Sequence, residues 1–134
     1  MEKSPELAAL LAEWFRAASS GDTGWIERHV SRRAESRLVG TDPTEWLAGD
    51  DVVDFLAREA RAFAGQVSID PGTPEAYRVG DVGWGITRPT IRMPSGMEIR
   101  PRWSAVFHRE DGQWKMVQIH ASLGISNADA GFED

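Results

Sequence analysis

The stretch RWSAVFHREDGQWKMVQIHAS, residues 102–122, decides the fold, because it contains two strands of alternating hydrophobicity joined by a turn. The pairing of these strands fixes the interior face, since a slip of one residue exchanges the two faces of a strand. A two-residue turn at Asp111 and Gly112 mixes apolar and polar residues on both faces. A three-residue loop at residues 110–112, with Gly112 in the left-handed position, separates them. We therefore predict the three-residue loop.

This register predicts one apolar face and one polar face for the two strands. The interior face is expected to consist of Trp103, Ala105, Phe107, Val117, Ile119 and Ala121. The outer face is expected to consist of Arg102, Ser104, His108, Gln118, His120 and Ser122. His120 is therefore predicted to lie outside any interior cavity.

The preceding hairpin, EAYRVGDVGWGITR at residues 75–88, also has large apolar residues at alternate positions. A turn at Gly80 and Asp81 pairs these residues across the two strands. We predict that they continue the interior face, which then ends in an arginine. The interior residues expected from this hairpin are Tyr77, Val79, Val82, Trp84, Ile86 and Arg88.

Arg88 is the conspicuous charge of this predicted interior face. Burying an unpaired guanidinium is costly, so three arrangements are open. Arg88 would hold a carboxylate or phosphate of a ligand, pair with Asp42, or extend to the rim of the pocket.

The residues before the strands predict three helices. Ser4 and Pro5 begin the first helix and Gly21 ends it. Helical patterns also occupy residues 22–30 and 49–63, before the hydrophobic period changes from helical to strand-like spacing. Helices followed by antiparallel strands define an α+β domain.

The length of 134 residues predicts one domain over residues 1–134, with a core at about 7–123 and an acidic, flexible tail at 126–134. The net charge of −6 argues against nucleic acid or a membrane surface as partner. The chain has no cysteine and no run long enough to span a bilayer. We expect a cytoplasmic protein without cofactor, and without metal because His29, His108 and His120 are scattered.

Six tryptophans are unusual in a chain of this length. Three of them, Trp14, Trp84 and Trp103, fit either a core or a cavity wall, and these roles merge where a cavity adjoins the core. The other three are expected to serve packing, and they are Trp25, Trp46 and Trp114.

Three segments carry a resemblance to a known family. GTDPTEWLAGDDVVDF at 40–55, GDVGW at 80–84 and residues 102–122 resemble the SnoaL-like branch of the nuclear-transport-factor-two-like superfamily, which includes ketosteroid isomerase. The resemblance covers about Leu7 to Leu123. It implies a cone-shaped, curved antiparallel sheet wrapped around N-terminal helices, a cystatin-like α+β barrel, with an interior cavity. It also implies a homodimer through the convex face, which carries Arg102, Ser104, Gln118 and His120.

Residue by residue, the chain departs from ketosteroid isomerase, whose base, tyrosine and protonated aspartate are known. Trp14 stands at the position of the tyrosine, and residues 103–105 contain no carboxylate. Asp42 lies near the position of the base but is offset by about two residues, in a Gly-Thr-Asp-Pro turn where aspartate is also an ordinary turn residue. Steroid isomerase activity is therefore disfavoured.

Three hypotheses of function remain open from the sequence. The first is a domain that binds an apolar or aromatic small molecule, with or without an anionic group, in a tryptophan-lined pocket. The second is a cofactor-independent isomerase, cyclase or dehydratase with Asp42 as general base. The third is a structural dimerisation module. The pocket residues predicted for the first hypothesis are Trp14, Tyr77, Trp84, Ile86, Arg88, Trp103, Ala105 and Ile119.

Overall fold

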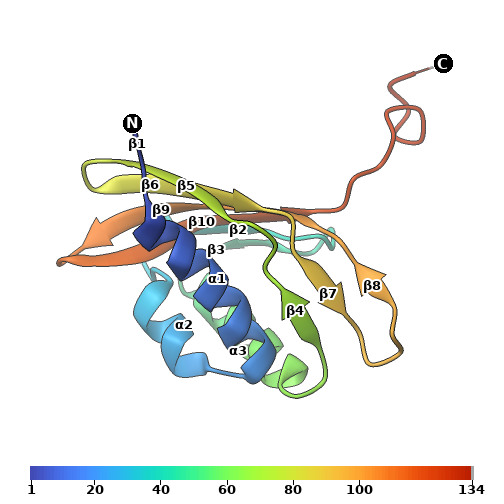
Figure 1. The fold of residues 1–134 in the computed structure, drawn as a ribbon, viewed down its shortest axis with the longest axis horizontal. Coiled ribbons are helices and arrows are strands. Elements are labelled where there is room, and N and C mark those ends of the chain that lie inside the picture. The colour runs from blue at the N-terminus through green and yellow to red at the C-terminus, as the bar shows by residue number, and fades with distance from the viewer. Residues whose placement is uncertain (134) are drawn as a thin grey trace.

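A computed structural model describes residues 1–133 and confirms the α+β class (Figure 1). Three helices lie against one face of a curved seven-stranded sheet, and a second sheet of three strands continues beside them. The elements are β1 (Glu2–Lys3), α1 (Pro5–Ser20), α2 (Thr23–His29), β2 (Arg37–Val39), β3 (Trp46–Ala48), α3 (Asp50–Phe63), β4 (Ser68–Asp70), β5 (Glu75–Val79), β6 (Val82–Thr87), β7 (Thr90–Arg92), β8 (Glu98–Ile99), β9 (Arg102–Glu110) and β10 (Gln113–Ser122).

The strand order of the large sheet is β1-β5-β6-β9-β10-β2-β3, and that of the small sheet is β4-β7-β8. Nearly all neighbouring strands are antiparallel, but β2 runs parallel to β10. The sheet is curved and open rather than closed into a barrel, because β1 and β3 are at its two edges. Figure 1 shows α1 and α3 together beneath the large sheet, on the side toward which β4 and β7 extend.

Helix α1 begins and ends at the predicted residues. The Ser4 hydroxyl accepts a hydrogen bond from the Leu7 backbone N–H at 3.2 Å, and Pro5 occupies the first helical position. Gly21 ends the helix in the left-handed conformation, with φ of 74°. The helix buries one apolar side against the sheet, which gives it stability beyond its own propensity.

The β9–β10 hairpin differs from the predicted loop near its turn. Its turn has two residues, Asp111 and Gly112, both with positive φ. A β-bulge between Met116 and Gln118 then adds one residue to β10, which exchanges the faces of the strand beyond it. Residues 118–122 therefore lie on the predicted faces, but they pair with 102–106 two positions away from the predicted register, since Ile119 is opposite Ala105 rather than Trp103. The predicted loop and the inward position of Val117 are wrong.

Because of the bulge, even-numbered residues of β10 face the interior before Val117 and odd-numbered residues face it afterwards. Trp114 and Met116 are buried near the turn, and Ile119 is buried beyond the bulge. Val117 instead contributes to a shallow depression of the outer face, together with Val106 and His108. The Arg109 guanidinium also lies over the Trp114 ring, with Cζ 4.5 Å from the ring centroid, which is a cation–π contact.

The interior assignment of the β5–β6 hairpin is wrong, although its pairing of Tyr77 with Trp84 is right. Gly85 pairs with Ala105, which is buried, while Trp84 pairs with Val106 on the opposite face. Glycine, not tryptophan, therefore faces the helices along β6. The large residues that lie outward instead are Tyr77, Val79, Val82, Trp84 and Ile86.

The reason for this reversal is the close approach of α1 to the sheet. A Cβ atom at Gly83 would lie 2.7 Å from the carbonyl oxygen of Tyr77 and would overlap the end of the Leu7 side chain. Leu11 occupies the corresponding space over Gly85. A large side chain on that face would displace the helix.

The core is built around four aromatic residues. Trp14 stacks on Trp103 with ring centroids 6.3 Å apart and planes inclined by 24°, and Phe15 meets Trp103 edge-on at 5.2 Å. Trp25 joins this cluster at 6.0 Å from Trp14. Trp46 was expected to serve packing as well, but it is 77% exposed on the edge strand β3, so that expectation is wrong.

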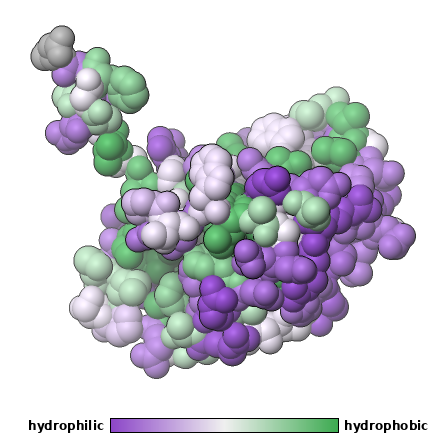
Figure 2. All heavy atoms as spheres, turned by 180° about the vertical axis from the view of Figure 1, so that it is seen from behind, coloured by the Kyte–Doolittle hydropathy of each residue, from purple (hydrophilic) through white to green (hydrophobic). Residues whose placement is uncertain are grey.

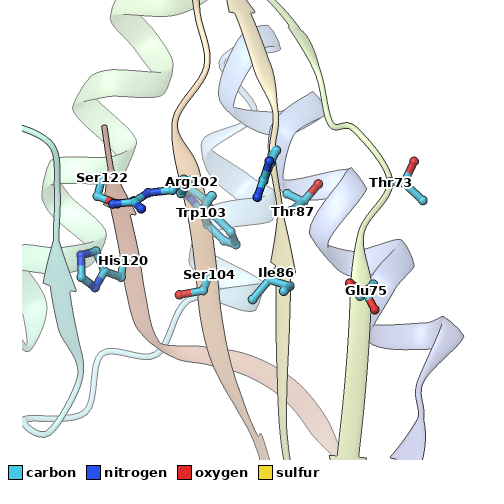
Figure 3. A pocket seen from close by; sticks show the side chains of 10 residues that line it. Thr73, Glu75, Ile86, Thr87, Arg102, Trp103, Ser104, His120 and Ser122 are labelled. Carbon is cyan, nitrogen blue, oxygen red and sulfur yellow. The ribbon is translucent and has the colours of Figure 1, made fainter. Parts of the chain in front are cut away.

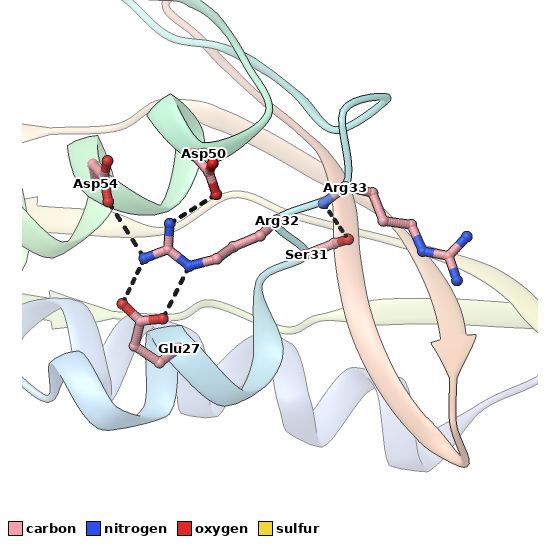
Figure 4. Close-up of polar contacts among 6 residues, drawn as sticks. All are labelled: Glu27, Ser31, Arg32, Arg33, Asp50 and Asp54. Atoms are coloured by element: carbon pink, nitrogen blue, oxygen red, sulfur yellow. Dashed lines mark hydrogen bonds and ion pairs between the residues drawn. The ribbon is translucent and has the colours of Figure 1, made fainter.

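An ion-pair network connects α2 with the start of α3 (Figure 4). Arg32 donates to Glu27 at 2.8 Å, to Asp50 at 3.0 Å and to Asp54 at 3.3 Å. These three carboxylates raise the pKa of the guanidinium above its ordinary value. Arg32 thus joins two helices at the surface.

The C-terminal segment extends away from the body of the fold (Figure 1). Within it, the Phe132 N–H donates to the Asn127 carbonyl at 2.8 Å, and Ile125 and Phe132 are exposed. The predicted flexibility of residues 126–134 remains a prediction, and residue 134 lies outside the described residues. None of the helices within residues 1–133 has the length and apolar content to cross a membrane.

Candidate functional site

A cavity of about 290 Å³ lies between the helices and the interior face of the large sheet. Helices α1 and α3 form one wall, and strands of both sheets with the segments that adjoin them form the rest. Its size is close to the lower limit of typical small-molecule sites. The cavity is lined by Trp14, Phe15, Ala18, Leu38, Val39, Gly40, Thr41, Glu45, Phe55, Leu56, Glu59, Ala60, Phe63, Ile69, Ile91, Met93, Ile99, Pro101, Trp103, Ile119, Ala121 and Leu123.

The lining of the cavity is apolar apart from a few groups, and its charged residues are Glu45 and Glu59. Glu59 is partly buried on α3. Burial, and secondly the negative charge of Glu45, raise the pKa of Glu59 to about 6. Within residues 1–133 no hydrogen bond or ion pair holds the Glu59 carboxylate. A carboxylate without a partner in an apolar cavity is a candidate binding group.

The sequence reading missed Glu59, although α3 contains a signal for it. Glu59 lies four residues after Phe55 and four residues before Phe63, so the three side chains follow one side of the helix. Phe55 and Phe63 both line the cavity, and a carboxylate between two phenylalanines on one helix side is therefore expected to face apolar surroundings.

The predicted pocket residues are divided between two faces of the sheet. Trp14, Trp103 and Ile119 line the inner cavity, and Ala105 is buried on the same face. The four others lie elsewhere, because the glycines of β6 take the interior positions. These four are Tyr77, Trp84, Ile86 and Arg88.

Asp42 is exposed in the turn before β3 and does not line the cavity. Its carboxylate accepts hydrogen bonds from the Thr44 backbone N–H at 2.9 Å and from the Thr44 hydroxyl at 2.6 Å. These two bonds hold the pKa of Asp42 below its ordinary value. The residue thus has the geometry of a turn aspartate, and its predicted role as a base has no contact with this site.

A second, shallower hollow of about 590 Å³ lies on the outer face of the large sheet (Figure 3). It crosses four neighbouring strands, with Glu75 on β5, Ile86 on β6, Ser104 on β9 and His120 on β10. Arg88 also lines this hollow, so the arginine is exposed on the outside rather than placed in the interior.

The predicted interface residues lie on this outer face. His120 is exposed on the predicted face, and its pairing partner is Ser104. Arg102 donates to the Ser122 hydroxyl at 3.3 Å, and Gln118 is exposed four residues before Ser122 on β10. The imidazole of His120 is therefore separated from the inner cavity by the sheet itself.

Apolar side chains are also exposed on this outer face. Val79 is 57% exposed, Val82 is 50% exposed and Ile86 is 41% exposed. Tyr77 and Trp84 lie beside them with ring centroids 5.0 Å apart.

The side of the molecule opposite to the view of Figure 1 also has hydrophobic atoms gathered across its middle, with hydrophilic atoms bordering them on the right (Figure 2).

Neither hollow contains a recognisable metal site. Within residues 1–133 no group of three histidine, aspartate or glutamate side chains is close enough to hold a metal ion. The inner cavity instead offers an aromatic wall, aliphatic side chains and two carboxylates. That combination suits an apolar molecule with one polar or charged end.

A curved sheet that encloses a cavity against N-terminal helices defines the class to which this fold belongs. The model of the SnoaL-like domain family matches residues 7–126. The chain therefore belongs to the SnoaL-like domain family. Comparison with curated proteins found no match.

Solved structures share the fold at low sequence identity. A candidate ketosteroid isomerase from Shewanella frigidimarina NCIMB 400 is 14% identical, with 88% of this chain and 96% of that chain covered and a TM-score of 0.71. A nuclear transport factor 2-like superfamily protein from Salmonella enterica is 13% identical, with 90% of each chain covered and a TM-score of 0.68. The association domain of CaMKII from C. elegans is 17% identical, with 87% and 92% covered and a TM-score of 0.67. At these identities the likeness shows the fold alone.

Proposed function

We propose that this SnoaL-like domain binds a small apolar or aromatic molecule in the inner cavity. The observation that carries the proposal is the composition of the lining, which is apolar except at a few positions. Trp14 and Trp103 stack on one another at the cavity wall and provide flat surface for a ring. Transfer of apolar ligand surface from water to this wall contributes about 25 cal/mol per Å² before the costs of association.

The proposal is tested with a neutral fluorescent probe, N-phenyl-1-naphthylamine, whose emission increases in apolar surroundings. Ile91 lines the cavity on β7, and Ile91→Trp fills part of the available volume. We expect the probe to bind the unmodified protein and to bind this variant at least about tenfold more weakly, since a filled cavity excludes the ring.

Ile125→Trp is the matched control, because Ile125 is 69% exposed in the C-terminal segment. This change adds the same indole outside the cavity and should leave probe affinity unchanged. Ala121→Leu is a smaller obstruction from β10 that serves if Ile91→Trp unfolds. Equal affinity in the unmodified protein and both cavity variants would refute the proposed site.

We also propose that the outer face of the large sheet forms a homodimer interface, with Arg102, Ser104, Gln118 and His120 within it. The exposed apolar residues of β5 and β6 favour this assignment, because a second copy would remove their surface from water. The C. elegans structure with this fold is named an association domain. Arg88 and Glu75 on the same face offer charges for contacts across such an interface.

Binding is preferred to catalysis by Asp42, because that carboxylate is engaged with Thr44 in an exposed turn. Arg88 lies on the outer face, so an anionic ligand group that pairs with it would bind there and not in the inner cavity. A cytoplasmic location remains the expectation from composition.

A further inference from the structure

We infer that the preferred ligand of the inner cavity is a hydrophobic cation, in which a protonated amine is attached to an apolar or aromatic body and pairs with Glu59. This inference rests on the proposed binding function of the cavity. It reverses the sign of the ligand charge expected from Arg88.

The charges of the cavity wall favour a cation. Glu45 and Glu59 are acidic, and no lysine, arginine or histidine is among the lining residues. An anionic ligand would therefore meet negative charge without a compensating partner, in surroundings where charges interact more strongly than in water. A cation would meet attraction from both carboxylates. The net charge of −6 adds a weak attraction of the same sign at long range.

Glu59 lacks the partner that a partly buried carboxylate ordinarily has. No side chain of residues 1–133 pairs with it, whereas the carboxylates of Glu27 and Glu98 each accept from an arginine. Burial disfavours the charged form of Glu59 and raises its pKa to about 6. An ammonium group would supply the missing hydrogen-bond donors and positive charge.

The surroundings of Glu59 suit the apolar part of such a ligand. Phe55 and Phe63 are one helical turn away on either side, and both line the cavity. Trp14 and Trp103 form the aromatic wall on α1 and β9. Aromatic faces attract cations as well as rings, so this wall is compatible with both the ammonium group and the apolar body of the ligand.

Glu45 is the other titratable residue of the wall, and it enters from the segment before β3. Its Oε1 already accepts the Asp42 backbone N–H at 3.4 Å. The parts of α1, β2, β4, β7, β8, β9 and β10 that line the cavity contribute no charged side chain. Glu59 is therefore assigned the direct contact, and Glu45 a supporting charge.

The test compares three ligands with one naphthalene body by isothermal titration calorimetry at about pH 7.5. They are 2-naphthylmethylamine, which is cationic, 2-naphthylmethanol, which is neutral, and 2-naphthoate, which is anionic. We expect the amine to bind about tenfold more tightly than the alcohol, as a charge-assisted hydrogen bond allows, and the carboxylate to bind most weakly.

Glu59→Gln keeps the shape of the side chain and removes its charge. The amine should lose about tenfold in affinity in this variant, while the alcohol should change by less than about twofold. Glu45→Gln is the matched variant at the second carboxylate and should cause a smaller loss. Amine affinity of the unmodified protein should also fall as the pH is lowered below about 6, because Glu59 becomes protonated, while alcohol affinity stays level.

The outcomes separate this inference from the proposed function. Failure of all three ligands and of the neutral fluorescent probe to bind would refute the binding function itself. Equal affinity for amine and alcohol, reduced for both by Ile91→Trp, would keep the binding function and overturn the charge preference. Retention of the amine preference by Glu59→Gln would overturn the role of Glu59. If that variant does not fold, the pH dependence of the unmodified protein decides, and a level amine affinity overturns the inference.

Discussion

Gly85 of β6 pairs with Ala105 of β9, and Leu11 of α1 lies directly over the glycine. This relationship sets the distance between α1 and the sheet. It also explains why the larger residues of β6 are on the outer face: the strand alternates in side-chain size, and the face toward α1 has room only for the small residues.

Replacing Gly83 with alanine should destabilise the fold. The new Cβ would lie 2.7 Å from the Tyr77 carbonyl oxygen and against the end of Leu7, so strand and helix must separate. We expect a loss of about 1–3 kcal/mol in the free energy of unfolding, measured by urea titration. Gly124→Ala places a methyl group where nothing lies within 4 Å and should change stability by less than about 0.5 kcal/mol. Equal stability of the two variants would contradict the close approach of α1.

Glu59→Gln should stabilise the protein at neutral pH. Burial raises the pKa of Glu59 from 4.5 to about 6, so the charged form is less favourable in the folded than in the unfolded state. After allowance for solvent screening, the gain in the free energy of unfolding is about 1 kcal/mol at a pH well above 6. Urea titrations of both proteins at about pH 7.5 measure this difference.

The pH dependence of that difference provides its own check. Between about pH 6 and 4.5 the folded protein binds more protons at Glu59 than the unfolded protein does. The unfavourable contribution of this group is therefore present above pH 6 and is relieved as the pH falls toward 4.5. The advantage of Glu59→Gln should shrink over the same interval. The exposed Glu35→Gln variant serves as control, and an advantage of Glu59→Gln that does not depend on pH would show that the carboxylate is not desolvated.

Ile86→Asp should weaken self-association through the outer face. Ile86 is 41% exposed on β6 beside Ser104, its pairing partner on β9. A carboxylate there would be buried against the second copy without a partner, so the dimer should dissociate at micromolar concentration. Multi-angle light scattering measures the mass. Met97→Asp adds the same charge in the β7–β8 hairpin, where Met97 is 59% exposed, and should leave the mass unchanged. A monomeric unmodified protein would refute the interface.

Arg32→Gln should loosen the contact between α2 and α3. The variant removes ion pairs to Glu27, Asp50 and Asp54, and exposed pairs contribute about 0.2–1 kcal/mol each. We expect a loss of about 1 kcal/mol at low ionic strength that diminishes when salt is added. Arg58→Gln alters an exposed arginine of α3 that has no ion pair among residues 1–133. A loss of similar size in that control, or one insensitive to salt, would argue against the network.

The hairpin at residues 102–122 shows both the reach and the limit of sequence reasoning. Segregation of apolar from polar residues correctly places Trp103 and Ile119 inside and His120 outside. The same criterion selects the wrong loop, because a bulge at Val117 after a two-residue turn restores the segregation just as well. Alternation determines which face each residue occupies, but it determines neither the partner across the hairpin nor the residue where an extra position is inserted.

The sequence by itself determined the three helices, the pairing of the β5–β6 hairpin, the faces of Trp103, Ile119 and His120, and membership of the SnoaL-like family, because hydrophobic period, caps and turns act over short distances along the chain. Only the tertiary structure decided which face of β6 is interior and that Glu59 borders the cavity. The interior face of β6 depends on how closely α1 approaches the sheet, through the fit of Leu7 and Leu11 over two glycines. The position of Glu59 depends on where α3 lies against the cavity. The volumes of side chains in packed layers determine which face is interior, and the sequence of β6 alone does not indicate which helix packs against it.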